Sequence, residues 1–340
     1  MTQQNLLEID GLKTIFSTEN GPVTAVDGIS FSIVAGETLG IVGESGCGKS
    51  VTAESIMRLL NEKSTRYEGA INFKGENLLA LPEYKMRDIR GNEVSMIFQD
   101  AMTSLNPVYT IGNQISESIM IHQNLNAKQA MEKSIEMLKL TGIPSPEKRV
   151  HEYPHEISGG MRQRVMIAMA LSCKPSLLIA DEPTTALDVT IQAQIIDLIN
   201  DLKQESNMSV MMITHDLGVV AEVCTRVIVM YLGQVIEEAD VNSLFTKPLH
   251  PYTKGLIKSI PRIDGDRTQK LYMIPGTVPS LSNIPKGCRF APRCSFADEK
   301  CWNDAPILEV ANTSQKVRCW HYEKIEKGEA VQHEAVEYGN

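Results

Sequence analysis

Short runs of apolar and β-branched residues recur along the first part of the chain, and turn residues separate them. Runs of this kind predict β-strands. The runs are Leu6–Ile9, Ala25–Ile33, Thr38–Val42 and Ala70–Phe73. Between the last two, a glycine-rich turn at Gly43–Gly48 leads into Ser50–Leu60, whose composition suits a helix. The chain therefore begins with strands and one strand–turn–helix unit.

In the middle of the chain the pattern changes to helical spacing. Between Asn106 and Cys173, apolar residues recur three or four positions apart in a charged background, as at Met131, Ile135 and Leu138. This spacing is typical of amphipathic helices. Strand-like runs then return at Leu177–Ala180, Val210–Ile213 and Val227–Tyr231, and the first two flank a helical pattern at Ile191, Ile195, Ile199 and Leu202. Strands that alternate with helices predict an α/β fold, with a mostly parallel sheet covered on both faces.

After about Val241 the regular pattern breaks up. Long regular elements are not expected there because prolines recur at Pro248, Pro251, Pro261, Pro275, Pro279, Pro285, Pro292 and Pro306,. We therefore predict two units. Residues 1–245 form the larger one, with a helical subdomain at about 106–173, and residues 246–340 form a small irregular C-terminal domain.

Composition places the chain among ordinary globular proteins, with 42% hydrophobic and 22% charged residues,. The longest apolar runs, such as Val227–Leu232, have the length of a strand and not of a membrane helix,. The polar start Met1–Asn5 lacks the pattern of a secretory leader,. These features predict a cytosolic protein whose membrane contacts come through partners. The net charge of −9 disfavours nucleic-acid binding,.

Candidate chemistry begins at the glycine-rich turn. The segment Gly43-Glu44-Ser45-Gly46-Cys47-Gly48-Lys49-Ser50 fits the phosphate-loop pattern at every fixed position, between a predicted strand and a predicted helix,. Glycines let backbone N–H groups wrap phosphates, and the helix N-terminus adds positive potential. Lys49 can reach the β- and γ-phosphates, and the Ser50 hydroxyl can ligate Mg²⁺.

An acidic pair suited to the same chemistry follows a later strand. The run Ser176–Ala180 is largely apolar and leads directly into Asp181 and Glu182. Asp181 is expected to hold Mg²⁺, and Glu182 to polarise the attacking water as general base. Phosphate loop and acids together predict a nucleotide triphosphatase.

Further motifs narrow the prediction to one family. Ile157-Ser158-Gly159-Gly160-Met161-Arg162-Gln163-Arg164 resembles the signature motif of ATP-binding cassette (ABC) ATPases and lies, as in that family, between the phosphate loop and Asp181. Gln99 matches the family's Q-loop, Asp188 in Ala186-Leu187-Asp188 its D-loop, and His215 its switch histidine. Met161 departs from the commonest signature, which has glutamine there, at a position that varies in the family.

The resemblance implies an ABC-type phosphate-loop nucleotide-binding domain with a helical subdomain. It also implies that two such domains close on two ATP molecules, head to tail, each signature motif acting on the ATP of the opposite subunit. The implied ATP-binding residues are Phe16, Gly43, Glu44, Ser45, Gly46, Cys47, Gly48, Lys49, Ser50, Val51, Ser158, Gly159, Gly160 and Asp188. The implied Mg²⁺ ligands are Ser50, Gln99 and Asp181. The implied catalytic residues are Glu182, His215 and Gln99. Phe16 would stack on adenine. A core phenylalanine stays open as the alternative, since extra residues at Ser17–Pro22 follow it.

The resemblance extends to one branch of the family. Asp100–Pro107 after the Q-loop, Pro248–Thr253 and the cysteine-bearing tail look like the importers of oligopeptides, dipeptides and nickel. In these importers a binding protein outside the cytoplasm serves two membrane permease subunits and two ATPase subunits, the second ATPase often a paralogue. The resemblance implies a peripheral subunit on the cytoplasmic face of the cell membrane. It also implies that Asp100–Pro107 docks the permease, and that the cargo is a peptide, with nickel as the alternative.

Other functions of the same family fit less well. Ribosome-acting ABC proteins usually carry two cassettes, whereas this chain has one phosphate loop. The interval between Lys49 and Ser158 leaves no room for a long coiled-coil arm, and the acidic balance disfavours DNA. Glu182 and His215 argue against a non-catalytic cassette.

The C-terminal domain carries a cluster of cysteines: Cys288, Cys294, Cys301 and Cys319. Four thiolates can hold zinc or a [4Fe–4S] cluster, and the resemblance to peptide-importer ATPases implies the cluster. Lys286, Arg289 and Arg293 could offset its negative charge or be solvated surface charges. We expect the nucleotide site to be independent of this tail, since the two belong to different units.

Overall fold

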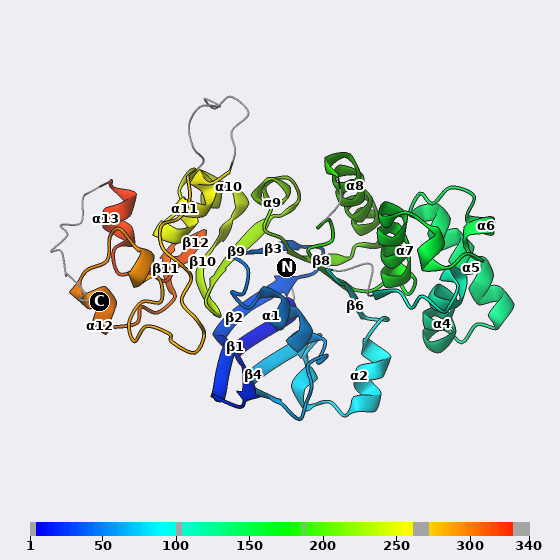
Figure 1. The fold of residues 1–340 in the computed structure, drawn as a ribbon, viewed down its shortest axis with the longest axis horizontal. Helices are drawn as coiled ribbons and strands as arrows, with labels where there is room; N and C mark the ends of the chain where they lie inside the picture. Colours follow the sequence, from blue (N-terminus) through cyan, green and yellow to red (C-terminus); the bar gives the residue numbers. More distant parts are fainter. Residues whose placement is uncertain (1–4, 100–103, 186–187, 261–271, 329–340) are drawn as a thin grey trace.

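The computed structural model describes residues 5–99, 104–185, 188–260 and 272–328. Within them the chain forms one large sheet, one small antiparallel sheet and the helices around them (Figure 1). In spatial order, the large sheet consists of β11 (Glu309–Asn312), β12 (Gln315–Val317), β10 (Gln234–Asp240), β9 (Arg226–Tyr231), β3 (Thr38–Val42), β8 (Ser209–Ile213), β7 (Leu177–Asp181) and β6 (Val94–Ile97). The small sheet consists of β2 (Gly21–Val34), β1 (Asn5–Thr18), β4 (Thr65–Phe73) and β5 (Glu76–Asn77).

Helices surround both sheets. They are α1 (Lys49–Ile56), α2 (Glu83–Ile89), α4 (Ile111–Gln123), α5 (Ala127–Leu140), α6 (Pro146–Arg149), α7 (Gly159–Leu171), α8 (Val189–Ser206), α9 (Leu217–Val223), α10 (Val241–Thr246), α11 (Pro251–Lys258), α12 (Glu299–Asn303) and α13 (Tyr322–Glu326). Short 3-10 turns add η1 (Leu78–Ala80), η2 (Pro154–Glu156) and η3 (Ala291–Arg293). The α/β fold expected from the sequence is confirmed.

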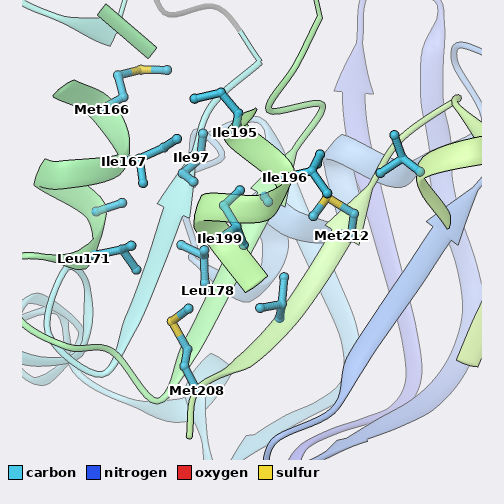
Figure 2. Close-up of a cluster of buried hydrophobic side chains, with 14 of the residues drawn as sticks. Ile97, Met166, Ile167, Leu171, Leu178, Ile195, Ile196, Ile199, Met208 and Met212 are labelled. Carbon is cyan, nitrogen blue, oxygen red and sulfur yellow. The ribbon is translucent and has the colours of Figure 1, made fainter. Parts of the chain in front are cut away.

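Residues of the parallel strands alternate between two cores. Leu178 and Met212 pack against α7 and α8, as Figure 2 shows with Ile199 of α8 beside Leu178 and Ile196 of α8 beside Met212. Their neighbour Leu177 points to the opposite face, toward α1 and the small sheet. Successive side chains of a strand point to opposite faces, so strands that are apolar throughout must be covered on both sides. This is why the predicted parallel strands read as continuous apolar runs.

The large sheet is parallel only in part. The strands β6, β7, β8, β3 and β9 run parallel, whereas β10, β12 and β11 are antiparallel additions. The change of direction occurs at Leu232 and Gly233, where both residues have positive φ, 43° and 77°. Two such residues make a type I′ hairpin turn, which joins only antiparallel strands. The sequence prediction of a mostly parallel sheet therefore holds for the central part only.

The first helix and the first two strands differ in length from their prediction. The helix expected at Ser50–Leu60 ends at Ile56, because Arg58 adopts left-handed backbone with φ 47° and its Nη1 donates to the Leu81 carbonyl at 2.5 Å. The first two strands are longer than expected, at 14 residues each. Bulges between Ile9 and Leu12 break their apolar–polar alternation, and this alternation is the signal that marks a strand in sequence.

The described residues from 104 to 173 contain helices and no strand. Beyond Val241 the described elements are short, as the prolines predict, but β12 pairs with β10 and so extends the large sheet. The boundary placed near residue 245 and the subdomain at 106–173 stay predictions. None of the described helices is long and apolar enough to span a membrane.

Candidate functional site

The phosphate loop joins the end of β3 to the start of α1. Its backbone needs glycine at two places. Gly43 has φ 154°, and a Cβ there would collide with the Met230 carbonyl. Gly48 has φ 100°, and a Cβ there would come within 2.7 Å of the Ala25 carbonyl. The loop therefore lies tightly against β9 and β2 and ends at the N-terminus of α1, which adds positive potential.

The Lys49 side chain lies inside this loop. Its ammonium donates to the Gly43 carbonyl at 2.8 Å and to the Glu44 carbonyl at 3.1 Å, and the residue is 6% exposed. Cys47 is turned toward the core, and burial raises the pKa of its thiol. Cys47 can therefore contribute only backbone groups to a ligand at this site.

A cleft of about 340 Å³ opens beside the loop. This volume is within the range of small-molecule sites. Its lining residues are Phe16, Val23, Ala25, Ser45, Gly46, Gly48, Lys49, Ser50, Val51, Gln99, Glu182 and Leu281. Gly43, Glu44 and His215 line an adjoining hollow of about 260 Å³. Sequence analysis missed Val23, Ala25 and Leu281, since neither β2 nor the segment around Leu281 carries a recognisable motif.

Asp181 ends β7 next to the start of α1. The Ser50 hydroxyl donates to its carboxylate, while its Oδ1 atom is buried without a hydrogen-bond partner. Burial raises the pKa of Asp181, although the hydrogen bond from Ser50 opposes the shift. A buried carboxylate oxygen without a partner is costly. A divalent cation bound between Ser50 and Asp181 would satisfy it, so these residues fit Mg²⁺.

Glu182 is the centre of a polar cluster at the mouth of the cleft. Its Oε2 accepts from Gln99 Nε2 at 3.0 Å and from Thr185 Oγ1 at 2.8 Å, and it lies 3.3 Å from His215 Nδ1. The Glu182 backbone is left-handed, with φ 47°, and its N–H donates to the Ile213 carbonyl at 2.8 Å. Strained non-glycine backbone of this kind gathers at functional sites. Three predicted catalytic side chains thus meet at one place, together with Thr185, which sequence analysis did not predict.

The predicted signature motif lies elsewhere. Ser158 caps α7 by accepting from the Met161 N–H, and Ser158 and Gly159 are exposed. Open space surrounds the position of a Cβ on Gly159. Among the described residues that line the cleft, none comes from this motif. Asp188, which caps α8, is exposed as well. The motif is therefore presented outward, away from the chain's own phosphate loop.

Parts of two predicted motifs lie outside the described residues. These are Asp100–Thr103 of the predicted permease-docking segment, and Ala186 and Leu187 of the predicted D-loop.

All four clustered cysteines meet in the C-terminal region. Cys288, Cys294, Cys301 and Cys319 line one narrow cavity. Burial raises the pKa of Cys288, and it raises the pKa of Cys294, Cys301 and Cys319 to about 12. The fold thus brings together four thiols that the sequence spaces widely.

The basic residues beside these cysteines correct a sequence-based expectation. Solvated surface charge was one interpretation, and it holds for the exposed Lys286 only. The side chains of Arg289 and Arg293 are 11% and 3% exposed, and they pair with Asp27 of β2 and with Glu44 of the phosphate loop. The tail thus contacts the phosphate loop directly, contrary to the expected independence of the nucleotide site.

Two family models match the chain. The model for "ABC transporter" matches residues 26–185, and the model for "Oligopeptide/dipeptide transporter, C-terminal region" matches residues 236–301. The first covers the phosphate loop, the signature motif and the acidic pair, and the second covers three of the four clustered cysteines.

Similar proteins extend over nearly the whole chain. The oligopeptide transport ATP-binding protein AppD of Bacillus subtilis (strain 168) is 54% identical over 320 residues, which are 94% of this chain and 97% of AppD. The oligopeptide transport ATP-binding protein OppD of Salmonella typhimurium is 51% identical over 93% of each chain. Among solved structures, the dimeric ATP-binding cassette MJ0796 bound to ADP and Pi has a TM-score of 0.63 at 25% identity, covering 69% of this chain and 98% of its own.

Proposed function

Because the chain belongs to the ABC transporter family, and within it to the oligopeptide transport ATP-binding proteins, we propose that it binds and hydrolyses ATP to energise peptide import. The observation that carries the proposal is the convergence of Lys49, Ser50, Asp181 and Glu182 on one cleft, in a chain that matches AppD and OppD along nearly its whole length. Residues 1–245 then act as the nucleotide-binding domain and residues 246–340 as the peptide-importer domain.

The first part of the mechanism is nucleotide binding. Phe16 and Leu281 line the cleft, and their apolar side chains would contact the purine ring. The N–H groups of the phosphate loop and the Lys49 ammonium then hold the phosphates. Ser50 and Asp181 would hold Mg²⁺, which would supply positive charge to offset negative charge on the transferring phosphoryl group.

The second part is hydrolysis. The Glu182 carboxylate accepts a proton from the attacking water, which requires that it exchange its contact with Gln99 for one with that water,. Gln99 and His215 orient the water and the γ-phosphate, because both already lie against Glu182. Contacts with Gln99, Thr185 and His215 orient the Glu182 carboxylate, and positioning of this kind makes up most of the catalysis of phosphoryl transfer.

The natural partners on this proposal are two membrane permease subunits and a second ABC ATPase, most simply a paralogue. An extracytoplasmic binding protein delivers the cargo. The chain would sit peripherally on the cytoplasmic face of the cell membrane. The segment Asp100–Pro107 would contact the permease, so that closure of the ATP site moves the membrane subunits.

Uptake by the reconstituted transporter tests the function. Proteoliposomes that hold the chain with its permease subunits and partner ATPase should accumulate labelled oligopeptides only when ATP is present. The Glu182→Gln variant is the matched control for assembly without hydrolysis. ATP-dependent uptake of Ni²⁺ without uptake of peptides would show that the cargo is nickel and not a peptide.

The outward position of the signature motif predicts that turnover depends on dimerisation. ATPase activity per chain should be weak when the chain is alone, rise with protein concentration, and be high in the assembled transporter. Gly159→Asp should keep the fold, since open space surrounds that position, and keep ATP binding in its own cleft. It should abolish turnover, because a carboxylate would repel the γ-phosphate of the opposite subunit. Full activity from a demonstrated monomer would contradict the composite site.

We also propose that the four cysteines hold a [4Fe–4S] cluster with a structural role. Four thiols that line one cavity suit such a group, because iron and zinc both bind cysteine as the thiolate, and each thiol would give up its proton on binding,. When bound, the cluster crosslinks Cys288 to Cys319 through iron–sulfur bonds. The region around them has short elements and little regular core, and small units of this kind commonly need such a crosslink.

The separation of ligand atoms favours the cluster over zinc. A single tetrahedral zinc brings its sulfurs to within about 3.8 Å of one another, as Zn–S bonds of about 2.3 Å require. Among the described residues, one group of three or more potential ligand atoms lies within 4.8 Å of one another, and it is Asp298, Cys301 and His321 rather than the four cysteines. The four sulfur atoms are therefore spread more widely than the ligands of one zinc ion, which supports the cluster.

Metal analysis of anaerobically purified protein tests this assignment. The protein should be brown and contain about four irons and four sulfides per chain. Cys294→Ser should remove the colour and make the tail sensitive to proteolysis, whereas Cys173→Ser, outside the cluster, should change neither. Stoichiometric zinc without iron would make the site a structural zinc site.

A further inference from the structure

Glu44 of the phosphate loop is held on three sides. Its N–H donates to the Tyr252 hydroxyl at 2.8 Å, and its carbonyl accepts from Lys49 at 3.1 Å. Its carboxylate accepts two parallel bonds from the Arg293 guanidinium, from Nη1 at 2.6 Å and from Nη2 at 3.0 Å. Tyr252 lies on α11, and Arg293 lies at the end of η3. Both belong to the C-terminal part of the chain, far from the phosphate loop in sequence.

Arg293 is built into the fold as a rigid group. Its side chain is 3% exposed, and its Nε donates to the Pro275 carbonyl at 3.0 Å. The guanidinium also lies 5.9 Å from the ring centres of both Tyr231 and Phe290. A planar fork held in this way binds a carboxylate in one orientation only, which an ammonium group cannot do.

The same residues connect the loop to the cysteines. The rings of Tyr231, Tyr252 and Phe290 form one cluster, with centroids 4.8 to 5.5 Å apart. Phe290 is two residues from Cys288, and Arg293 directly precedes Cys294. The short segment that carries both Phe290 and Arg293 is therefore bounded at each end by a cysteine of the cluster site.

We propose that Arg293, together with Tyr252, is a positioning residue of the ATP site. The two residues clamp Glu44, so that the conformation of the phosphate loop depends on whether the four-cysteine region is structurally ordered. This inference rests on the ATP-binding role proposed above and extends it to residues that touch no nucleotide.

The physical reason is preorganisation. The phosphate loop contains three glycines between Gly43 and Gly48, so without external contacts it would adopt many conformations, and binding ATP would have to order it. Ordering a loop on binding lowers affinity. The clamp removes that cost, because it fixes both the backbone N–H and the carboxylate of Glu44 before ATP arrives. Loss of the clamp should therefore weaken ATP binding more than it slows the chemical step.

Equilibrium binding of a fluorescent ATP analogue with Mg²⁺ to the isolated full-length chain tests the clamp. Arg293→Ala should raise the dissociation constant by about tenfold, the equivalent of about 1.4 kcal/mol. Arg293→Lys, which keeps the charge and loses the fork, should give an intermediate value, and Tyr252→Phe, which loses only the hydroxyl, a smaller rise. In the assembled transporter, Arg293→Ala should raise the KM for ATP with kcat less affected.

A double-mutant cycle separates positioning from general destabilisation. If Arg293 acts through Glu44, then Arg293→Ala should have no further effect in the Glu44→Ala background. The matched control is Arg289→Ala, because Arg289 is a buried arginine of the same segment that pairs with Asp27 and not with the loop. It should lower thermal stability and leave the dissociation constant unchanged. A wild-type dissociation constant for Arg293→Ala, equal effects in both backgrounds, or an equal effect of Arg289→Ala would overturn the clamp.

Binding by the Cys294→Ser variant tests the link to the cysteine region. In this variant residue 294, which follows Arg293, can no longer bind the proposed cluster. The dissociation constant for the ATP analogue should therefore rise, as in Arg293→Ala. Combining the two changes should raise it little further. Unchanged binding in a cluster-free protein would show that the clamp is independent of the cysteines and would overturn that part of the proposal. Failure of the wild-type chain to bind the analogue at all would instead refute the proposed function.

Discussion

Replacing Glu182 with glutamine is expected to lower ATP turnover by about 10²–10⁴-fold, the usual loss when a general base is removed. Glutamine has the shape of glutamate, so the contacts with Gln99, Thr185 and His215 and the strained backbone should be preserved. ATP binding should be unchanged. The protein should then accumulate as an ATP-bound dimer, because the two subunits separate after ATP hydrolysis, and hydrolysis no longer follows binding.

Single-turnover hydrolysis, with binding and gel filtration measured on the same samples, checks this result. Glu222→Gln, an exposed glutamate on α9, is a control that should turn over like the wild type. Wild-type turnover by Glu182→Gln would mean that another group accepts the proton of the attacking water.

Replacing Lys49 with alanine is expected to affect both binding and chemistry. The ammonium lies inside the phosphate loop, 6% exposed and bonded to two loop carbonyls. On ATP binding it should leave the Gly43 and Glu44 carbonyls and contact the phosphates instead. Loss of one such preorganised charge typically lowers turnover by about 10²–10³-fold. Since the charge also contacts the phosphates before reaction, the dissociation constant for ATP should rise as well.

The contrast between the two variants is informative. Glu182→Gln should separate binding from hydrolysis, whereas Lys49→Ala should impair both in the same titration. Lys63→Ala, which removes an exposed lysine from a turn, controls for the lost charge. If Lys49→Ala bound ATP as tightly as the wild type, the phosphates would have to lie elsewhere in the cleft.

Sequence analysis located the phosphate loop, the acidic pair and the central strands because each is a local pattern. The loop fits a fixed spacing between Gly43 and Ser50, and Leu177–Asp181 is a continuous apolar run that ends in an acid. Such signals do not depend on what the rest of the chain does. The meeting of Gln99, Glu182 and His215 was expected from the resemblance to ABC ATPases, since no spacing rule relates three residues so far apart.

The rest of the site depends on contacts between distant parts of the chain. Arg293 and Glu44 are 249 positions apart, and nothing in either local sequence marks them as partners. Leu281 lines the nucleotide cleft from a segment that sequence patterns describe only as irregular. The aromatic cluster of Tyr231, Tyr252 and Phe290 likewise joins β9, α11 and the cysteine segment. Only the folded chain shows that residues well beyond 245 line the cleft and contact the phosphate loop.

The pairing of β10 with β12 has a consequence for how the chain folds while the ribosome is still synthesising it. Glu237 pairs with Val317, and a ribosome that adds about 5–20 residues per second needs roughly 4–16 s to synthesise the roughly 80 residues between them. During this interval β10 is the open edge of a nascent sheet, the kind of surface on which newly made chains aggregate. Its two adjacent glutamates protect it. Later, Glu237 accepts from the N–H groups of Leu249 and His250, and Glu238 pairs with Lys316 at 3.0 Å. Glu238 therefore opposes association with other chains during synthesis and binds β12 afterwards.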